Sequence, residues 1–318
     1  MTERKWTIAS ASSAAPRRTR WLRICLTALA VALSVSAPPL LGVTRAAAAS
    51  PPNIMVIVEE NQGYSNIIGS SQAPYINSLA STYASATQWF GLKDSSLADY
   101  VALISGKIGQ YGVPTLVGEL ATAGISWKAY MENMPSPCYT GLAVGNYEKI
   151  HNPFVYFKSI TSNPAQCDQV VPFADTTTST GFVSDLTGNT APNFMFVVPN
   201  ICNDMHSKCT TTNKIKVGDD WLKSNLAVVF GSQWYADGGI VIVTWDSATT
   251  ADTSFWNTGS GGHIPTVVIS ATSSGAFTSG GNHYGTLRAI EEAYGVGLLG
   301  NSSGNSSDPP NGDLKPAL

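Results

Sequence analysis

Apolar residues along the chain gather in short runs that alternate with amphipathic stretches. The runs are rich in β-branched residues and end abruptly in polar ones, which is typical of strands buried on both faces of a sheet. They predict strands at residues 53–58, 85–92, 125–131, 193–198, 240–245 and 266–270. Helices are predicted at residues 73–83, 97–105, 219–230 and 283–294. This alternation predicts an α/β fold, a layered sandwich with a mainly parallel central sheet.

Two of the predicted strands run directly into acidic residues. The run 53–58 is followed by Glu59, Glu60 and Asn61, and the run 239–245 is followed by Asp246. Because the carboxyl ends of parallel strands share one edge, which is where ligands bind in open α/β sheets, these side chains are expected to meet. Hard oxygen ligands at one edge predict a metal or phosphate site. The alternative is that the acids only end the strands and face water.

The N-terminus has the pattern of an export signal. Four arginines at positions 17, 18, 20 and 23 precede an apolar segment at 24–43, and the alanines at 46–49 offer a cleavage site. A membrane anchor is the competing interpretation, because the segment is nearly long enough to span a bilayer. Pro38 and Pro39 favour cleavage instead. We therefore expect a signal peptide at 1–49, one domain at 50–300 and a flexible tail at 301–318.

Cysteine usage agrees with export and predicts two disulfides. One of the five cysteines lies in the segment that export would remove, which leaves four in the mature chain. Four cysteines permit three pairings, and we favour Cys138 with Cys167 and Cys202 with Cys209, because each pair brackets a loop-like stretch. A zinc site is the alternative, which the irregular spacing without any C-x-x-C disfavours. The weakly patterned residues 135–192 are expected to form a disulfide-tied excursion over the functional edge.

Composition and charge exclude several classes of protein. The chain has 318 residues, of which 43% are hydrophobic and only 12% charged, so disorder is not expected. The net charge is −3, and no basic stripe with interleaved aromatic residues is present. We therefore expect no nucleic-acid partner.

The polar residues capable of chemistry lie in predicted loops or at the ends of elements. The four histidines His151, His206, His263 and His283 are all of this kind. A lone histidine is more often structural, but four in such positions can supply neutral ligands or proton donors. Ser96 precedes a predicted helix, where main-chain N–H groups and the helix dipole favour an anion. The alternative for Ser96 is a simple N-cap.

An ordered set of motifs carries a resemblance to a known family. The motifs are V-I-V-E-E-N, A-P-Y-I-N-S-L-A, S-L-A-D-Y-V-A-L-I-S-G, G-I-S-W-K-A-Y-M-E-N-M-P-S-P-C, H-N-P-F-V-Y-F, P-N-I-C-N-D-M-H, V-I-V-T-W-D, G-H-I-P-T-V-V-I-S and N-H-Y-G-T-L-R-A-I-E. Together they resemble the bacterial phosphoesterase family, which contains secreted acid phosphatases and phospholipase C enzymes with an alkaline-phosphatase-like fold. The resemblance covers residues 53–298 and is closer to the small acid phosphatases.

The resemblance implies roles for individual residues. Glu60, Asn61 and Asp246 match the positions that hold a divalent metal ion, and Ser96 matches the hydroxyl nucleophile. A metal would lower the pKa of the hydroxyl, and a phosphoserine intermediate would then be hydrolysed by water. The remaining residues would bind phosphoryl oxygens or protonate the leaving alcohol. They are His206 and His283 as catalytic groups, with Asp204, His263 and, more weakly, His151 as substrate-binding groups.

The chain also departs from the family pattern. Asp94 and Asp99 stand where the family often has histidine and asparagine, and Ser247 stands where a carboxylate often follows the strand aspartate. An added negative charge beside an incoming phosphate is unfavourable unless it is protonated or offset by metal. Ser95 also remains a possible nucleophile, although the spacing to the following motif residues favours Ser96.

The sequence therefore predicts a secreted, metal-dependent phosphomonoesterase that acts on a small-molecule or lipid phosphoester. Stable membrane insertion is not expected once the signal is cleaved. Two alternatives stay open. One is a phospholipase C or other phosphodiesterase, and the other is a noncatalytic extracellular binding protein with a decayed site.

Overall fold

The structure is a computed structural model. It describes residues 50–174, 181–209, 212–248, 261–304 and 314–318, all of which belong to the compact unit Ala49–Leu318. The predicted signal peptide and its cleavage site lie outside these residues. So does the middle part of the predicted tail.

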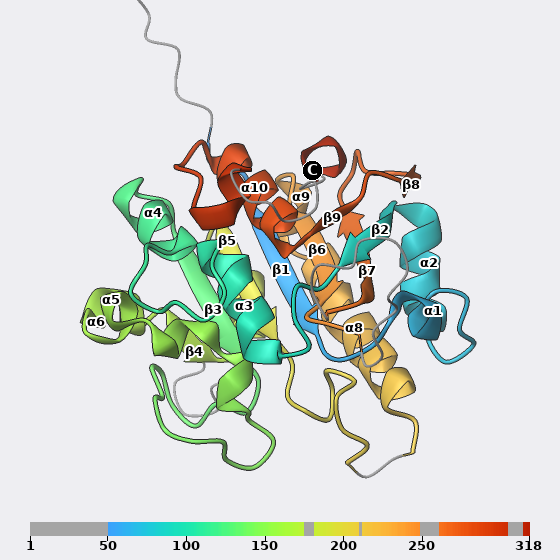
Figure 1. The fold of residues 1–318 in the computed structure, drawn as a ribbon, viewed down its shortest axis with the longest axis horizontal. Helices are drawn as coiled ribbons and strands as arrows, with labels where there is room; N and C mark the ends of the chain where they lie inside the picture. Colours follow the sequence, from blue (N-terminus) through green and yellow to red (C-terminus); the bar gives the residue numbers. More distant parts are fainter. Residues whose placement is uncertain (1–49, 175–180, 210–211, 249–260, 305–313) are drawn as a thin grey trace, which may run out of the picture. The chain divides into compact units, whose positions relative to one another are not determined.

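A nine-stranded sheet forms the centre of this unit (Figure 1). Its strands are β1 (Ile54–Glu59), β2 (Ala84–Phe90), β3 (Trp127–Met131), β4 (Val170–Pro172), β5 (Phe194–Val198), β6 (Ile240–Trp245), β7 (His263–Ile269), β8 (Ala276–Phe277) and β9 (Gly281–Asn282). Their order is β4-β3-β5-β1-β6-β7-β2-β8, and β9 also pairs with β2. Among these strands only β7 runs against its neighbours. The predicted α/β fold with a mainly parallel sheet is confirmed.

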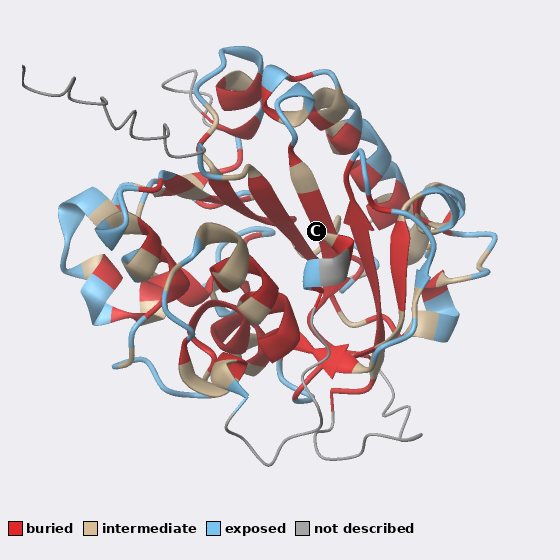
Figure 2. Ribbon diagram, turned by 90° about the horizontal axis from the view of Figure 1, so that it is seen from above, coloured by how far each residue is buried: buried red, intermediate tan, exposed pale blue. Residues whose placement is uncertain are grey.

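Helices cover the sheet on both sides (Figure 2). The α-helices are α1 (Tyr64–Ile67), α2 (Pro74–Thr82), α3 (Ser96–Ser105), α4 (Leu116–Thr122), α5 (Lys158–Thr161), α6 (Pro164–Cys167), α7 (Phe182–Thr187), α8 (Lys214–Phe230), α9 (Gln233–Ala236) and α10 (His283–Tyr294). Helices α3, α4 and α10 contact one another, and α8 contacts α2, α7 and α9. Within the described ranges, no helix has both the length and the apolar character needed to cross a bilayer.

The core lies where the β-branched runs predicted it. Every residue of β1 is at most 1% exposed, and the described strands on either side of it are almost as deeply buried. Strands covered by helices on both faces need apolar side chains at every position, which explains the continuous runs. Figure 2 shows the strands mostly in the red of buried residues, with helices on either side of them.

The predicted elements are present, and two of their boundaries are shifted by three residues or more. Strand β7 begins at His263, three residues before the predicted start at 266. Helix α8 begins at Lys214 rather than 219, because the Asn213 side chain caps it by accepting a hydrogen bond from the Lys216 N–H at 3.1 Å. Asparagine is a preferred N-cap residue, so this start carried a sequence signal that the apolar pattern alone did not use.

The weakly patterned stretch 135–192 contains more regular structure than expected. Besides α5, α6 and α7 it holds the edge strand β4 and two 3₁₀ helices, η1 (Lys149–His151) and η2 (Pro153–Tyr156). These pieces are three to six residues long, too short to leave a periodic signature. Both predicted disulfides, Cys138–Cys167 and Cys202–Cys209, are formed, and the first ties this excursion to the end of α6.

The described parts of the C-terminal segment pack against α10, which differs from the flexible tail that composition predicted. They include the 3₁₀ helices η3 (Gly300–Ser303) and η4 (Lys315–Ala317). The Ser302 hydroxyl donates to Glu291 Oε2 at 2.5 Å, and Leu314 is fully buried. An apolar side chain and a buried hydrogen bond therefore help to hold the described residues 300–304 and 314–318 against α10.

Candidate active site

The two strands that run into acid are neighbours in the sheet. Strands β1 and β6 pair in parallel with Glu59 opposite Trp245, so that Glu60 and Asp246 are the next residues on each. The Asp246 N–H donates to the Glu59 carbonyl at 2.9 Å and continues the ladder by one step. The sequence therefore folds two segments almost two hundred residues apart into one carboxyl edge.

Asn61 joins the two strand ends. Its main-chain N–H donates to Asp246 Oδ1 at 2.8 Å, and its side-chain Nδ2 donates to Glu60 Oε2 at 2.7 Å. Asn61 has a φ of 50°, a left-handed conformation that asparagine tolerates better than most residues. The Ser247 hydroxyl lies between Asn61 Oδ1 and Asp246 Oδ2, at 3.4 and 3.3 Å. A compact group of oxygen atoms results.

Five carboxyl groups at this edge are fully buried. They are Glu59, Glu60, Asp99, Asp204 and Asp246. Within the described part of the chain, no lysine or arginine forms a salt bridge with any of them. Burial raises the pKa of Glu60 well above its ordinary value, and the nearby charges of Asp246 and Asp204 raise it further. This concentration of negative charge requires protons or a cation for compensation.

The oxygen atoms of Glu60, Asn61 and Asp246 fit a hard divalent cation. Glu60 Oε1 is buried and accepts no hydrogen bond from any described residue, and carboxylate and amide oxygens are the ligands that such ions prefer. Over the described residues, no three histidine, cysteine, aspartate or glutamate side chains are grouped so as to hold a metal ion. A metal here would therefore need the Asn61 amide oxygen in addition to the two carboxylates.

Ser96 lies directly against this carboxylate group. It is the first residue of α3, one position earlier than the predicted helix start, and its hydroxyl donates to Glu60 Oε2 at 2.9 Å. The N-cap is Ser95, whose exposed side chain makes no capping hydrogen bond. Of the two serines, Ser96 is therefore the one in contact with the candidate metal ligands, and it lies at the positive end of a ten-residue helix.

The Asp99 carboxylate forms hydrogen bonds with the main chain at this edge. Its carboxylate accepts the N–H of Leu92 at 2.6 Å and the N–H of Lys93 at 3.1 Å. These bonds fix the turn that leads from β2 into α3. Burial and the charge of Asp246 raise the pKa of Asp99, while the two N–H donors oppose that change. Asp94, the other aspartate that departs from the family pattern, lies exposed on the same turn.

His151, the weakest of the predicted binding residues, reaches the centre of the site. Its Nε2 lies 3.3 Å from Glu60 Oε1 and its Nδ1 lies 3.3 Å from Asp204 Oδ2. The ring stacks on Tyr100, with 5.7 Å between ring centroids. Burial lowers the pKa of His151 to about 4, so the imidazole is neutral at pH 7. A neutral ring carries one proton and can donate to only one of these two carboxyl groups.

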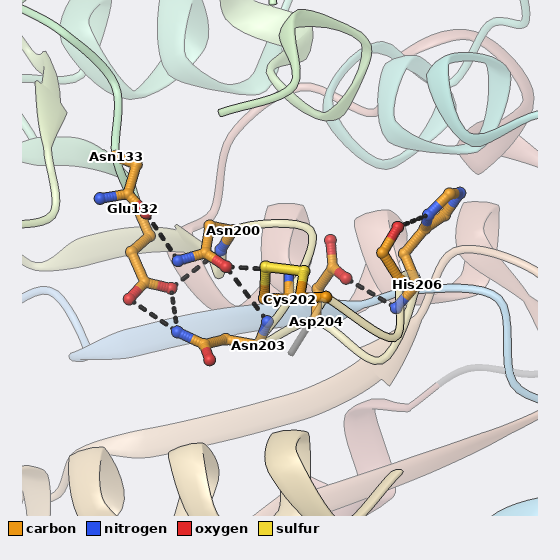
Figure 3. Close-up of a disulfide and its surroundings, with 9 residues drawn as sticks. Glu132, Asn133, Asn200, Cys202, Asn203, Asp204 and His206 are labelled. Carbon is orange, nitrogen blue, oxygen red and sulfur yellow. Dashed lines mark hydrogen bonds between the residues drawn. A yellow bond between two sulfur atoms is a disulfide. The ribbon is translucent and has the colours of Figure 1, made fainter. Parts of the chain in front are cut away.

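Asp204 and His206 are placed by the disulfide-closed loop that follows β5 (Figure 3). The Asp204 main-chain carbonyl accepts a hydrogen bond from the Glu60 N–H at 2.8 Å, which joins the loop to the end of β1. The base of the loop is held by Glu132, which accepts the Asn200 N–H at 2.8 Å and the Asn203 amide at 2.9 Å. The His206 ring is exposed and lies 5.7 Å from that of His151. His206 can therefore meet a bound substrate from the solvent side.

The other two histidines are held by neighbouring groups. His283 is fully buried, and its Nε2 donates to the Asp246 carbonyl at 2.6 Å. Burial lowers the pKa of His283 to about 4. The His263 ring lies parallel to that of Tyr64 at 4.3 Å and close to that of Phe90 at 5.1 Å, and its Nε2 lies 3.0 Å from the Thr87 carbonyl. Both histidines border the site but are packed into its walls.

The sequence indicates no role for Tyr100, and it indicates Glu59 only as one of the acidic residues that end the first strand. Tyr100 is buried beneath His151, and Glu59 is buried with neither carboxylate oxygen hydrogen-bonded. Tyr100 follows Ser96 by four residues on α3, so helical spacing places both on one face and could have identified it. Glu59 is the last residue of β1, and no sequence signal distinguishes it from a strand-ending acid.

Solved structures with a similar fold include a protein in the alkaline phosphatase superfamily. A superfamily protein from Vibrio parahaemolyticus aligns over 77% of this chain and 67% of that chain, with a TM-score of 0.54 and 15% identity. A lipoteichoic acid synthase from Listeria monocytogenes aligns over 78% of this chain and 74% of that chain, with a TM-score of 0.54 and 12% identity. At these identities the likeness shows the fold alone, and that fold is alkaline-phosphatase-like, as expected.

The sequence profile of the Phosphoesterase family matches residues 66–297. The chain therefore belongs to the phosphoesterase family, which confirms the resemblance drawn from its motifs, and it is a hydrolase that acts on phosphoric ester bonds. A phosphatidylinositol-3-phosphatase of Mycobacterium tuberculosis is 29% identical over 86% of this chain and 87% of its own length. An acid phosphatase of Aspergillus fumigatus is 26% identical over 70% of this chain but only 51% of its own length.

Proposed function

We propose that the chain is a secreted, metal-dependent phosphomonoesterase with Ser96 as its nucleophile. The observation that carries this proposal is the hydrogen bond from the Ser96 hydroxyl to Glu60 within the group of buried carboxylates. A serine at the start of a helix, in contact with candidate metal ligands, combines a nucleophile with an anion-binding position.

The relatives support a monoester rather than a diester as substrate. The mycobacterial protein and the fungal protein described above both carry the names of phosphatases. The mycobacterial name specifies a phosphorylated inositol lipid, and that relative is covered over 87% of its length. We therefore include lipid-borne phosphomonoesters in the substrate class, together with small soluble ones.

The charge at the site supports dependence on a metal. A phosphate dianion would enter an edge with five buried carboxyl groups, and like charges at short range repel strongly where water is excluded. A divalent cation held by Glu60, Asn61 and Asp246 would offset this charge, polarise a phosphoryl oxygen and lower the pKa of the serine hydroxyl. No such compensation comes from lysine or arginine salt bridges among the described residues.

The residues of the chain then divide the reaction between them. Ser96 Oγ attacks phosphorus in line with the leaving oxygen, forming an O–P bond as the ester bond breaks, and its proton passes first to Glu60, the acceptor it already faces. The exposed His206 is placed to protonate the departing alcohol. Water then attacks the phosphorus of the phosphoserine and gives a proton to His206. The bond from phosphorus to Ser96 Oγ breaks, phosphate leaves, and the proton on Glu60 returns to Ser96. Asp204 and His151 hold Glu60 in position.

Secretion is supported by the two disulfides. Disulfides form and persist in oxidising compartments, and both pairs join cysteines of the predicted mature chain. The arginine-rich and apolar segment before residue 50 is proposed to direct export.

The experiment compares three substrates with and without a chelator. Purified mature protein is assayed with p-nitrophenyl phosphate, bis-p-nitrophenyl phosphate and a phospholipid. The proposal expects hydrolysis of the monoester, little of the diester, and loss of activity with chelator that added divalent metal restores. Preference for the diester would favour a phosphodiesterase, and no turnover with any ester or metal would favour a noncatalytic binding protein.

A further inference from the structure

One loop of the protein exposes an unusual number of apolar side chains. Six large hydrophobic residues are exposed among the described residues, and three lie within nine positions of one another. These are Leu142, Val144 and Ile150, at 80%, 46% and 45% exposure. All three belong to residues 132–150, here called the β3 loop because it follows β3. Scattered apolar residues are ordinary on protein surfaces, but a group of them marks an interaction site.

The β3 loop is also free of charge where it is most exposed. Residues 133–147 contain no aspartate, glutamate, lysine, arginine or histidine, and residues 142–146 are all exposed. A surface loop normally carries charged side chains that keep it in water. An exposed, uncharged segment with leucine and valine instead lowers the cost of leaving water for an apolar phase.

The loop is held firmly while it presents these side chains. The Cys138–Cys167 disulfide fixes one end, and Val144 and Tyr147 exchange main-chain hydrogen bonds of 3.1 Å. Lys149 Nζ donates to the Thr140 carbonyl at 2.8 Å and closes the other end. Because the backbone is fixed by these bonds, the exposure of Leu142 and Val144 is a property of the folded loop and not of a loose segment.

The β3 loop lies at the same edge of the sheet as the candidate active site. It leaves the carboxyl end of β3, and its Asn146 carbonyl accepts the N–H of Ile201, in the loop that carries Asp204. Ile150 directly precedes His151, which contacts Glu60. Figure 1 shows the light green β3 loop and the yellow segment after β5 projecting together beyond this edge.

We propose that the β3 loop inserts Leu142 and Val144 into a lipid surface and so presents the active site to a membrane-borne phosphomonoester. This inference rests on the proposed function, since it specifies where the substrate of that site is located. A bilayer fits the loop better than a charged partner because residues 133–147 offer apolar contact and no ion pairs. The shared edge places the inserted residues and the phosphoryl site on one side of the sheet, as a headgroup at a bilayer surface requires.

The test uses the mature protein, one double variant and one matched control. The double variant is Leu142→Ser with Val144→Ser. The control is Leu298→Ser, an exposed leucine that follows α10 near the opposite end of the sheet. Flotation with phosphatidylcholine vesicles measures binding without substrate. Hydrolysis is measured with phosphatidylinositol 3-phosphate in the same vesicles and with soluble p-nitrophenyl phosphate.

We expect the double variant to lose at least about tenfold in vesicle binding and in kcat/KM for the vesicle substrate, as the loss of two inserted side chains implies. Its turnover of p-nitrophenyl phosphate should stay within about twofold, and the control should match the wild type throughout. Equal vesicle binding by wild type and double variant would overturn the inference. So would concentration-dependent dimers that the double variant abolishes, because the loop would then bind a second copy. Failure of the proposed function would appear separately, as absent p-nitrophenyl phosphate turnover with vesicle binding intact.

Discussion

The two edges of the central sheet differ sharply in how their polar groups are satisfied. At the amino edge, Asn53 Nδ2 donates to the Trp234 carbonyl at 3.0 Å, Trp234 Nε1 donates to the Pro192 carbonyl at 2.8 Å, and the Tyr294 hydroxyl donates to the Asn193 carbonyl at 3.0 Å. At the carboxyl edge, five carboxyl groups are buried together, and several of their oxygens have no hydrogen-bond partner in the described part of the chain. The polar groups at the amino edge of the sheet therefore have hydrogen-bond partners, whereas several of those at the carboxyl edge do not have one among the described residues.

This difference indicates that the amino edge contributes mainly to stability and the carboxyl edge mainly to ligand binding. Buried polar groups are normally paired, and a group that is not paired lowers stability unless a ligand completes it. The amino edge follows the rule, whereas the carboxyl edge departs from it at Glu59, Glu60 and Asp204. Such departures are expected where a site must hold a ligand. Substitutions at the two edges should consequently act on different measurable quantities.

The largest effect is expected from Ser96→Ala. Removing the hydroxyl should lower kcat for p-nitrophenyl phosphate by about 10⁴-fold or more, as loss of a nucleophile does in other hydrolases. The thermal midpoint should hardly change, because the Ser96 side chain is not the helix cap. Acid quenching should trap a phosphoserine in the wild type and none in the variant.

Ser95→Ala is the matched control for this measurement. Ser95 is exposed and its side chain makes no capping bond, so its removal should leave the rate nearly unchanged. Retention of most activity by Ser96→Ala would instead indicate direct attack by water and would remove Ser96 from the mechanism.

The next effect concerns Asp246→Asn at the same edge. The substitution keeps the size of the side chain but removes one negative charge from the candidate metal ligands, so metal affinity should fall by at least about 100-fold. Calorimetric titration with a divalent metal measures this directly, and activity should fall in parallel. Because Asp246 Oδ1 accepts the Asn61 N–H, correct folding is checked by circular dichroism. Unchanged metal affinity in a folded variant would contradict the ligand assignment.

The sequence predicted the buried framework well and short irregular elements poorly. The run ending in Glu59 and the run ending in Asp246 identified β1, β6 and their shared edge, because strands covered on both faces leave an unbroken apolar signature. Strand β4 left none, since its three residues Val170–Pro172 at the sheet edge are too few to show a period. Pairing of β4 with β3 depends on contacts that no local pattern encodes.

The sequence predicted which positions meet at the carboxyl edge, but not the contacts among them. Strand ends and a helix start located Glu60, Asp246 and Ser96, since topology alone brings such positions to one edge. The place of His151 between two carboxyl groups comes from η1 and the folded β3 loop, whose course the pattern did not reveal. The sequence predicts Asp99 as an added charge beside the phosphate, and the structure adds that its carboxylate accepts two main-chain N–H groups of the preceding turn.

Removing the Cys138–Cys167 bridge should reduce stability more than activity. Replacing both cysteines with serine releases a loop of 29 residues and should lower the free energy of unfolding by about 2–4 kcal/mol. The Cys202–Cys209 bridge closes only seven residues and should cost less stability, but it lies in the loop that places Asp204 and His206. Urea unfolding and kcat measured on both variants should therefore rank them in opposite order. If the same variant lost more of both stability and kcat, the two disulfides would not differ in the way proposed.

Glu59→Met should stabilise the protein at pH 8. Burial raises the pKa of Glu59 well above its ordinary value, with Asp204, Glu132 and Asp219 adding to the effect, so its stability contribution is lost as pH rises. A methionine of similar size removes a buried carboxyl group without hydrogen bonds and should add about 2 kcal/mol to the free energy of unfolding. Urea unfolding at pH 8 measures this change in the free energy of unfolding. A loss of stability would show that the Glu59 carboxyl group has a stabilising partner. Glu59 would then belong to the candidate site.

The smallest effect is expected at Glu291, on α10 behind the site. Unlike Glu59, this buried carboxyl group accepts hydrogen bonds, so the substitution tests whether such a group costs less stability. Glu291 accepts the Leu299 N–H at 2.9 Å and the Ser302 hydroxyl at 2.5 Å, and burial raises its pKa from 4.5 to about 7. A raised pKa means that the folded state favours the protonated acid, so stability is greatest below about pH 4.5 and falls as pH rises through about 7. Glu291→Gln removes this titration but weakens one hydrogen bond by about 2 kcal/mol at either pH, which leaves a net gain of about 1 kcal/mol at pH 8 and a net loss of about 1 kcal/mol at pH 5. Urea unfolding at both pH values measures the difference, and an equal change at pH 5 and pH 8 would show that Glu291 does not titrate between them.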